Sequence, residues 1–226
     1  MRVLVVIPAY NEEDCLATTI QNLTDVCPDV DYLVVNDGSH DRTGDICDEL
    51  GLNHVDLPIN TGLTSGFRTG VIYAWRHGYD AVAQFDADGQ HLPQYLHLLS
   101  QAMEEHNADI VIGSRYLAGQ KAVGLRDVGS RIIARLIQLT TGTSITDPTC
   151  GLRIYSRRLM PTFITDFDTG PEPDTIALLI RGGARITEIP IVIQERQGGE
   201  SYLKPIKAAR YMLRICTSII LFQWFR

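Results

Sequence analysis

The sequence predicts an α/β fold in which a mostly parallel central sheet carries helices on both faces. Apolar runs of strand length alternate along the chain with longer segments of helical periodicity, as in successive β-α-β units. The runs are apolar throughout, which is typical of strands buried on both faces of a parallel sheet. With 226 residues, of which 45% are hydrophobic and 21% charged, the chain has the size and composition of one substantial globular domain.

The predicted strands are short, and turn or helix signals follow each of them. They cover residues 2–7, 32–36, 54–57, 80–85, 109–112 and 186–193, and the turn of residues 147–153 leads into a further strand. Asn11 has the character of an N-cap, since Glu12, Glu13 and Asp14 follow it in what would be the first turn of a helix to about Thr24. The remaining helices are expected near residue 41, after Gly66, at 93–106, at 126–141 and from Pro171 onward.

Two of these helices have apolar faces that we expect to point into the core. The spacing is that of one helical stripe in both cases. The expected inward-facing residues are Phe67, Val71, Ala74 and Trp75 on the first, and Ile132, Ile133, Leu136 and Ile137 on the second.

Polar residues follow several predicted strands at their carboxyl ends. Pro8-Ala9-Tyr10, Asp37 and Asp86-Ala87-Asp88 all stand at such positions. Ligands of parallel sheets bind beyond the carboxyl ends of the strands, so we expect these segments to form one site. Two carboxylates spaced two residues apart suit Mg²⁺ or Mn²⁺, which take their other ligands from water and phosphate. A solvated acidic turn is the alternative for the isolated motif.

Charge divides the chain into an acidic and a basic half. Of the 27 acidic residues 18 lie in residues 1–113, whereas 16 of the 20 Lys and Arg lie in residues 114–226. A basic half favours a phosphate group or an anionic surface as its ligand. We expect no nucleic-acid partner.

The C-terminal segment has a composition of its own, so we divide the chain into a main α/β domain, 1–200, and a C-terminal amphipathic helix, 201–226. Lys204, Lys207, Arg210 and Arg214 occur there without an acidic residue, and a nearly apolar run to Phe225 follows. That run is shorter than the ~20 residues needed to cross a bilayer. A helix in the membrane interface, a helix packed on the domain, an oligomer contact and a chain that stops before a true span all remain open.

The start of the chain and its cysteines indicate a cytoplasmic protein. The first apolar run is short and ends at Pro8 without a cleavage-type sequence, so we expect no signal peptide. The cysteines are odd in number and widely spaced, which favours free buried thiols in a reducing compartment. They are Cys15, Cys27, Cys47, Cys150 and Cys216.

Several motifs, in the right order, resemble those of family 2 glycosyltransferases, which have the GT-A (Rossmann-like) fold. The resemblance covers nearly the whole chain and is narrower still to polyprenyl-phosphate sugar transferases of the dolichyl-phosphate mannose synthase type. The family motifs are Ile7–Glu12, Asn36–Thr43 and Asp86–His91, and those of the narrower group are Gly113–Tyr116, Asp147–Arg153 and Arg196–Ser201.

The resemblance implies a role for individual residues. The nucleoside of a sugar nucleotide would be held by Pro8, Ala9, Tyr10, Glu12 and Asp37, and the divalent metal on its diphosphate by Asp86, Asp88 and Gln90. The phosphate of the acceptor would be bound by Arg115, Arg126, Ser130 and Arg196. The candidate catalytic residues are Asp88, Asp147 and Arg115. Arg126 and Ser130 stand one helical turn apart, so both can address one ligand, although a salt-bridged helix surface explains the spacing equally well.

The implied activity is inverting transfer of a hexose from a UDP- or GDP-sugar to polyprenyl phosphate, for cell-envelope glycan synthesis. The enzyme would be peripheral on the cytoplasmic face of the membrane, bound directly or through a small membrane protein, and homo-oligomerisation is left open. A second hypothesis makes the acceptor a sugar hydroxyl of a growing polysaccharide, with Asp147, Glu172 or Asp174 as the base. A third is a catalytically inactive regulator that binds sugar nucleotides. The sugar itself is left open.

Overall fold

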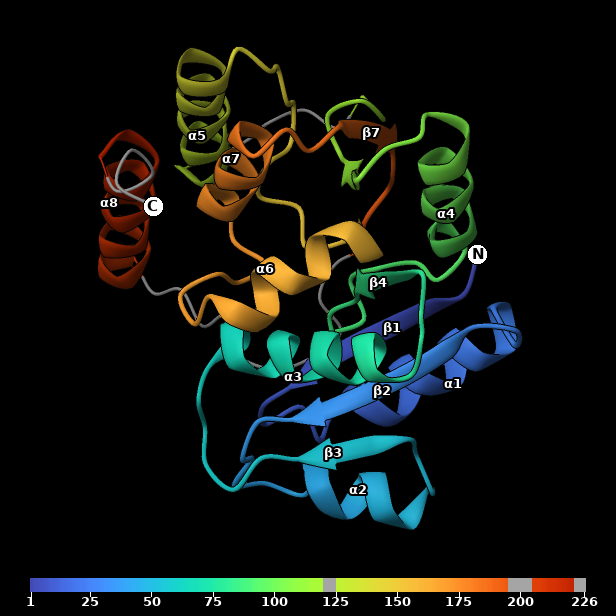
Figure 1. Cartoon of the computed structure of the whole chain (residues 1–226). Helices are drawn as coiled ribbons and strands as arrows, with labels where there is room; N and C mark the ends of the chain where they lie inside the picture. The colour runs from blue at the N-terminus through green and yellow to red at the C-terminus, as the bar shows by residue number, and fades with distance from the viewer. Residues whose placement is uncertain (120–124, 195–204, 222–226) are drawn as a thin grey trace.

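A seven-stranded sheet runs through the described part of the chain in the order β3-β2-β1-β4-β6-β5-β7 (Figure 1). This computed structural model describes residues 1–119, 125–194 and 205–221. The strands are β1 (Val3–Ala9), β2 (Asp31–Asn36), β3 (His54–Asp56), β4 (Ala81–Gln84), β5 (Ile110–Ser114), β6 (Arg153–Ser156) and β7 (Ile186–Pro190). The helices are α1 (Leu16–Val26), α2 (Thr43–Glu49), α3 (Leu63–Arg76), α4 (Tyr95–Glu105), α5 (Leu125–Thr141), η1 (Arg157–Leu159), α6 (Met160–Thr165), α7 (Pro173–Arg181) and α8 (Pro205–Ile220).

The sheet is mostly parallel, which confirms the predicted α/β architecture. Strand β1 pairs in parallel with β2 and β4, β2 with β3, and β5 with β7. Strand β6 alone among the described strands is antiparallel to its neighbours, β4 and β5, between which it lies. Because β6 runs opposite to both, β4 and β5 point the same way, and their carboxyl ends meet at one edge of the sheet.

The core forms where apolar strands meet the apolar faces of the helices. Leu4, Val5, Val6 and Ile7 of β1 are fully buried, as expected for a central strand covered on both faces. Helix α3 packs against β1, β2 and β4. A Cβ atom at Gly70 of α3 would lie 2.3 Å from Cγ1 of Val6, so this close approach depends on glycine.

The structure corrects three local predictions. Asn11 does not cap a helix, because α1 begins at Leu16 and Asn11 instead has a positive φ of 55° and accepts a hydrogen bond from the His40 backbone. Trp75 points outward with 39% of its surface exposed, and Arg157 stacks over its ring at 4.3 Å. Ile132 is 46% exposed, while Ile133 and Ile137 are buried as predicted.

Helix α8 packs against α5 and α7, at the end of the molecule away from β3 (Figure 1). Ile215 and Ile219 of α8 are fully buried, whereas Leu213 is 70% exposed. The sequence left a packed helix open as one alternative for this segment, and the structure adopts it. No described helix has the length and apolarity required to cross a membrane.

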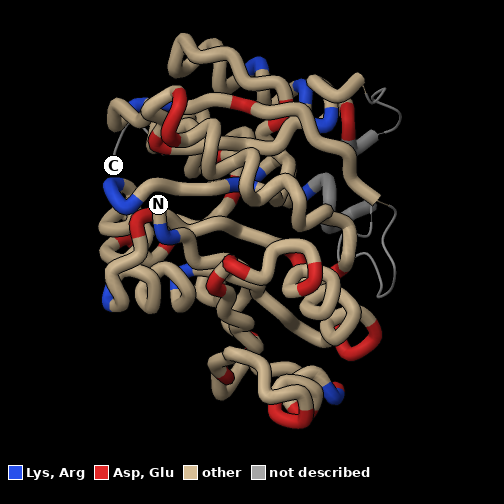
Figure 2. Tube along the Cα trace, turned by 90° about the vertical axis from the view of Figure 1, so that its right-hand side faces the viewer, with Lys and Arg blue, Asp and Glu red and all other residues tan. Residues whose placement is uncertain are grey.

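Charge and cysteine chemistry agree with the sequence. Acidic positions predominate at the end of the molecule that carries α2 (Figure 2). None of the cysteines forms a disulfide. Burial raises the pKa of Cys47 to about 11 and that of Cys150 to about 12, so both thiols stay protonated at neutral pH.

Candidate active site

The predicted site segments lie at one edge of the sheet. Tyr10, Asp37, Asp86 and Arg115 each follow directly, or within two residues, the carboxyl end of β1, β2, β4 or β5. These four strands all run in the same direction. These four site residues therefore start from strand ends on the same edge of the sheet.

Asp86 is held from three sides. Gln84 Nε2 donates to Asp86 Oδ1 at 3.1 Å, and the Asp86 backbone N–H donates to Nδ1 of His91 at 3.3 Å. The other oxygen, Oδ2, lies 3.7 Å from His91 Nε2. A Cβ atom at Gly151 would lie only 2.5 Å from Asp86 Oδ2, so the turn before β6 closes against this carboxylate because it has a glycine there.

Asp88 is the second carboxylate of this loop and is 8% exposed. Its Oδ1 accepts the backbone N–H of Gln90 at 3.1 Å, which folds the loop into a tight turn. Thr19 of α1 donates to the Ala87 carbonyl at 2.9 Å and so fixes the loop to α1. The Gln194 backbone N–H donates to the Gln90 carbonyl at 2.9 Å, so the chain beyond β7 also reaches this loop.

The oxygen atoms of this loop suit a divalent cation that a bound phosphate would also coordinate. Asp86, Asp88 and Gln90 offer the hard oxygens that Mg²⁺ and Mn²⁺ prefer. Within the described residues, no cluster of three or more His, Cys, Asp or Glu could complete a metal cage. A metal here would therefore take its remaining ligands from phosphate and water, as Mg²⁺ commonly does.

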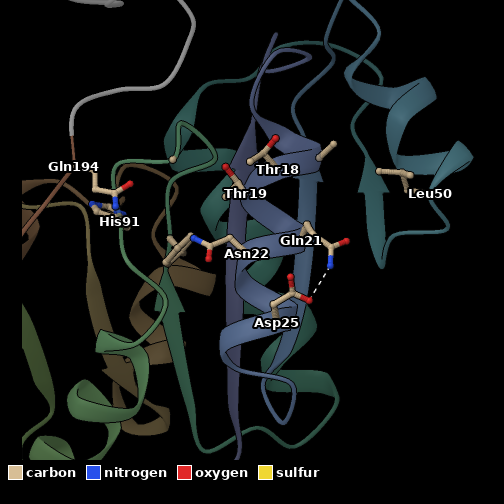
Figure 3. A pocket seen from close by; sticks show the side chains of 11 residues that line it. Thr18, Thr19, Gln21, Asn22, Asp25, Leu50, His91 and Gln194 are labelled. Carbon is tan, nitrogen blue, oxygen red and sulfur yellow. Dashed lines mark hydrogen bonds between the residues drawn. The ribbon is translucent and has the colours of Figure 1, made fainter.

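A groove of about 670 Å³ lies beside this loop (Figure 3). Asn22 and Thr18 of α1 line one side, and His91 and Gln194 line the other. The groove therefore lies between α1 and the loop that carries Asp86 and Asp88.

Asp37 holds the turn that leads into α3. It is 4% exposed, and its Oδ1 accepts hydrogen bonds from the backbone and hydroxyl of Thr61, both at 2.8 Å. Its Oδ2 accepts the Gly62 backbone N–H at 2.7 Å. The structure thus gives Asp37 a role that the sequence did not indicate, because the partner turn lies more than twenty residues away.

The segment after β1 is fixed to the start of α2. The backbone N–H of Glu12 donates to Thr43 Oγ1 at 2.9 Å, and Asp41 accepts hydrogen bonds from Glu13 and Thr43. Burial tends to raise the pKa of Asp41, but these hydrogen bonds outweigh it, and the pKa is lowered from its ordinary value. Tyr10 lies edge-on to the His40 ring at 6.3 Å.

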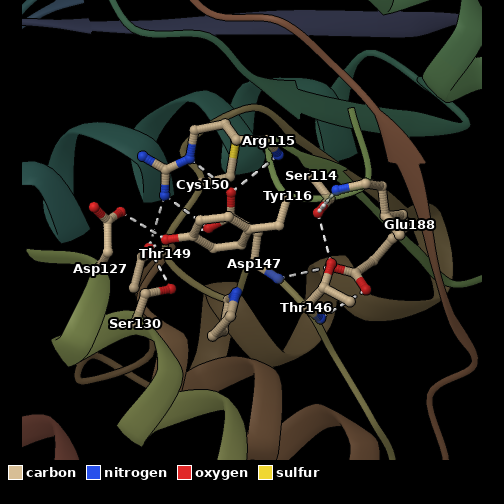
Figure 4. A network of polar contacts seen from close by, with 12 residues as sticks. Ser114, Arg115, Tyr116, Asp127, Ser130, Thr146, Asp147, Thr149, Cys150 and Glu188 are labelled. Atoms are coloured by element: carbon tan, nitrogen blue, oxygen red, sulfur yellow. Dashed lines mark hydrogen bonds and ion pairs between the residues drawn. The ribbon is translucent and has the colours of Figure 1, made fainter. Parts of the chain in front are cut away.

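Arg115 and Asp147 form a two-pronged ion pair at the end of β5 (Figure 4). Arg115 Nε donates to Asp147 Oδ2 at 2.6 Å and Nη2 donates to Oδ1 at 2.7 Å. The Asp147 side chain is fully buried, while that of Arg115 is 24% exposed. The hydrogen bonds from Arg115 to Asp147, opposed by burial, raise the pKa of Arg115 above its already high value. The Arg115 cation is therefore fixed in orientation and keeps one side toward solvent.

Hydroxyl groups extend this pair toward α5. Arg115 Nη2 also donates to Thr149 Oγ1 at 3.0 Å, and Thr149 lies 3.0 Å from the hydroxyl of Ser130. Ser130 is almost fully buried, so it lies behind Arg115 and away from the surface. Tyr116 donates to Asp127 of α5 at 2.8 Å. The structure thus brings Arg115, Ser130 and Asp147 together.

Two further acceptor candidates are not placed. Arg126 belongs to α5, but its side chain is outside what the structure describes, as is all of Arg196.

Glu172 and Asp174, the other base candidates for a hydroxyl acceptor, contact α8. Glu172 pairs with Arg214, and Asp174 Oδ2 accepts the Ser218 hydroxyl at 2.6 Å. Burial raises the pKa of Glu172, although the neighbouring Arg214 acts in the opposite direction. Their contacts are those of groups that fasten α8 to α7.

The fold is shared with a solved glycosyltransferase. Glucosyl-3-phosphoglycerate synthase from Mycobacterium tuberculosis, in complex with Mn²⁺, uridine-diphosphate-glucose and phosphoglyceric acid, superposes with a TM-score of 0.73. The superposition covers 98% of this chain and 79% of that chain at 17% sequence identity. At this identity the likeness establishes the fold, and the GT-A prediction is confirmed.

Sequence relatives are closer. The undecaprenyl-phosphate mannosyltransferase of Micrococcus luteus is 35% identical over 213 residues, which is 89% of this chain and 87% of the relative. The polyprenol monophosphomannose synthase of Mycolicibacterium smegmatis is 32% identical over 227 residues, covering 95% of this chain and 85% of the relative. Residues 4–162 match the family described as glycosyl transferase family 2. This chain belongs to glycosyl transferase family 2.

Proposed function

We propose that this enzyme transfers a hexose, with inversion, from a nucleotide sugar to the phosphate of a polyprenyl phosphate in cell-envelope glycan synthesis. The observation that carries the proposal is the fixed Arg115 cation at the same sheet edge as Asp86 and Asp88. The relatives from Micrococcus luteus and Mycolicibacterium smegmatis are both named as polyprenyl-type phosphate mannosyltransferases, which supports this acceptor.

The donor side would use the loop after β4. Asp86, Asp88 and Gln90 would hold a divalent metal on the diphosphate of the donor, and the metal would stabilise the negative charge that develops on the leaving nucleoside diphosphate. Pro8, Ala9, Tyr10, Glu12 and Asp37 would line the nucleoside subsite. The solved relative that holds both Mn²⁺ and uridine-diphosphate-glucose supports a metal-bound donor.

The acceptor side would use Arg115. Its Nε and Nη2 are committed to Asp147 and Thr149, whereas Nη1 donates to no described residue. A phosphate oxygen could accept from Nη1 in a charge-assisted hydrogen bond. Arg126 and Arg196 would complete this subsite, and the buried Ser130 would support it through Thr149. The phosphate oxygen is already anionic near neutral pH, so attack on the sugar needs no strong base.

The contacts of the acidic residues favour this acceptor over a sugar hydroxyl. A hydroxyl must lose its proton, so Asp147, Glu172 or Asp174 would have to act as the base. Asp147 is buried and accepts two hydrogen bonds from the Arg115 side chain, Glu172 pairs with Arg214, and Asp174 binds Ser218. In this proposal Asp147 orients Arg115 and does not accept a proton from the acceptor.

The outer face of α5 and α8 would hold the enzyme on the cytoplasmic face of the membrane as a peripheral protein. Leu139 on α5 and Leu213 on α8 are 81% and 70% exposed, and the two helices pack against each other. Helix α8 contains no acidic residue, and basic residues interleave with the apolar ones, which suits a bilayer interface with anionic lipid. The exposed residues of this α5–α8 face are Val128, Arg131, Ile132, Arg135, Leu139, Arg210, Leu213 and Ile220. A small membrane partner and a homo-oligomer are not part of this proposal.

A donor and acceptor screen tests the function. Purified enzyme with Mn²⁺ or Mg²⁺ is incubated with UDP- and GDP-hexoses and a short polyprenyl phosphate, and products are identified by mass spectrometry. We expect polyprenyl-phosphate hexose from one donor. No such product from any donor, with transfer to a free glycan hydroxyl in the same mixture, would contradict the proposal.

A further inference from the structure

The turn of residues 146–150, which joins the end of α5 to β6, is held by two charged side chains of opposite sign. We propose that Glu188 and Arg153 are positioning residues that hold this turn and thereby set the Arg115 guanidinium for the acceptor's phosphate. The proposal rests on the proposed function for the identity of that ligand. Neither residue was among the site residues expected from the sequence.

Glu188 of β7 accepts hydrogen bonds from the donor groups in the first half of the turn. Its Oε1 accepts the Asp147 backbone N–H at 2.9 Å and the Thr146 hydroxyl at 3.0 Å, and its Oε2 accepts the Thr146 backbone N–H at 2.8 Å. The Thr146 hydroxyl also lies 2.6 Å from that of Ser114, the residue before Arg115 (Figure 4). One carboxylate thus satisfies three donors of two consecutive residues, and the turn is also fixed to the end of β5.

Arg153 of β6 donates hydrogen bonds to the carbonyl groups in the second half of the turn. Its Nη2 donates to the Pro148 carbonyl and its Nε to the Cys150 carbonyl, both at 2.6 Å. Its Nη1 donates to the Pro171 carbonyl at 3.0 Å. The side chain is 2% exposed, and no carboxylate accepts these three hydrogen bonds. Burying a cation in this way is costly unless its hydrogen bonds are satisfied, and here backbone carbonyls satisfy them.

The two charges leave the turn little freedom to move. Two of its N–H groups are committed to a carboxylate and two of its carbonyls to a guanidinium, so a shift would break several charge-assisted hydrogen bonds at once. Asp147 and Thr149 are the two residues of this turn that accept hydrogen bonds from Arg115. The position of the turn therefore sets the position of Arg115, as supporting residues do for the groups they orient.

The larger effect should fall on the acceptor subsite, because Glu188 binds the first half of the turn, whereas Gly151, which closes against Asp86, follows its second half. The loop that carries Asp86 and Asp88 is fixed by Gln84, His91 and Thr19, and Asp37 by Thr61 and Gly62, whereas the hydrogen bonds described for Glu188 go to Thr146 and Asp147. Loosening the turn should thus weaken phosphate binding by Arg115 more than donor binding.

Glu188→Gln tests this with little change in shape. The amide keeps one acceptor oxygen and places an N–H group where the other accepted a donor, so the turn loses at least one hydrogen bond. We expect the KM for polyprenyl phosphate to rise about tenfold, with the donor KM within about twofold of the parent.

Asp109→Asn is the matched control. Asp109 is also a buried carboxylate that accepts a backbone N–H, from Arg185, and pairs with Arg158, but it lies before β5, at the opposite end of that strand from Arg115. It should lower stability without separating the acceptor KM from the donor KM. Equal changes in both KM values in Glu188→Gln, or the same separation in Asp109→Asn, would overturn the proposal.

A measurement without substrate keeps the two proposals separable. Exchange of the Arg115 Nε–H proton with water is followed by NMR, with Arg115→Lys identifying the resonance. We expect exchange about tenfold faster in Glu188→Gln than in the parent and unchanged in Asp109→Asn. Unchanged exchange in Glu188→Gln would overturn the positioning role. A parent enzyme that ignores polyprenyl phosphate would instead refute the proposed function, whatever the exchange rate.

Discussion

Replacing Asp147 by asparagine should cost much more stability than removal of an ordinary surface ion pair. The Asp147 side chain is fully buried and accepts hydrogen bonds from Arg115 Nε at 2.6 Å, Arg115 Nη2 at 2.7 Å and the Arg115 backbone at 3.1 Å. Asparagine keeps one acceptor and turns its amide toward the guanidinium, which leaves the Arg115 cation without a counter-charge.

The magnitude follows from burial. Removing one partner of a buried pair costs about 3–5 kcal/mol, and because Arg115 retains 24% exposure we place this loss near the lower bound, about 3 kcal/mol. For a domain of this size that corresponds to a fall in Tm of about 6–12 °C. Arg115→Met should be similarly costly, because it leaves the Asp147 carboxylate buried and unpaired.

Thermal unfolding of the two single variants and the double variant measures the coupling. The double variant should be less destabilised than the sum of the single variants by about 2 kcal/mol or more, since it leaves no buried charge unpaired. Additive losses of stability, or a Tm of Asp147→Asn within about 2 °C of the parent, would refute the view that Asp147 pairs with Arg115 and orients it.

Four other perturbations separate the parts of the site. EDTA should abolish transfer and added Mn²⁺ should restore it, and full activity in EDTA would exclude the metal. Gly151→Ala places a Cβ atom 2.5 Å from Asp86 Oδ2, so kcat/KM should fall about tenfold with little loss of Tm, whereas unchanged kinetics would show that the turn yields freely. Leu139→Glu should weaken sedimentation with anionic liposomes, while Leu98→Glu on α4, at 47% exposure, should not, and equal binding by both variants would rule out the α5–α8 face. The lowered pKa of Asp41 stabilises the fold at pH values above its ordinary pKa of 3.8, and this stability is lost as the pH falls through the folded-state pKa. The difference in urea midpoint between the parent and Asp41→Asn should therefore shrink below about pH 4. A difference that stays constant with pH would contradict this.

Strand ends were the part of the site that the sequence could reveal. Asp86 and Asp88 follow an apolar run directly, so their place at the sheet edge depends only on local sequence and on the parallel arrangement. The same holds for Asp37 and Arg115. The contact between Arg115 and Asp147 could not be predicted in this way, because more than thirty residues separate them.

Residues whose partners are distant in sequence could not be assigned. Glu188 stands in an apolar strand and carries no motif, and its three donors lie more than forty residues earlier. The direction of β6 is likewise set by the strands on both sides of it. Ile132 belongs to the apolar stripe of α5, but this stripe is wider than the face that α5 buries. Ile132 therefore lies on the exposed α5–α8 face.

The central claim is that a phosphate group, held by Arg115, is the acceptor. The most direct measurement is the kcat/KM for a short polyprenyl phosphate in the parent and in Arg115→Ala, with the donor KM measured in parallel. The parent should transfer a hexose, and the variant should lose about tenfold to a hundredfold in acceptor efficiency at an unchanged donor KM, as expected for one lost charge-assisted hydrogen bond. A parent enzyme that ignores polyprenyl phosphate, or a variant that uses it as well as the parent does, would contradict the account.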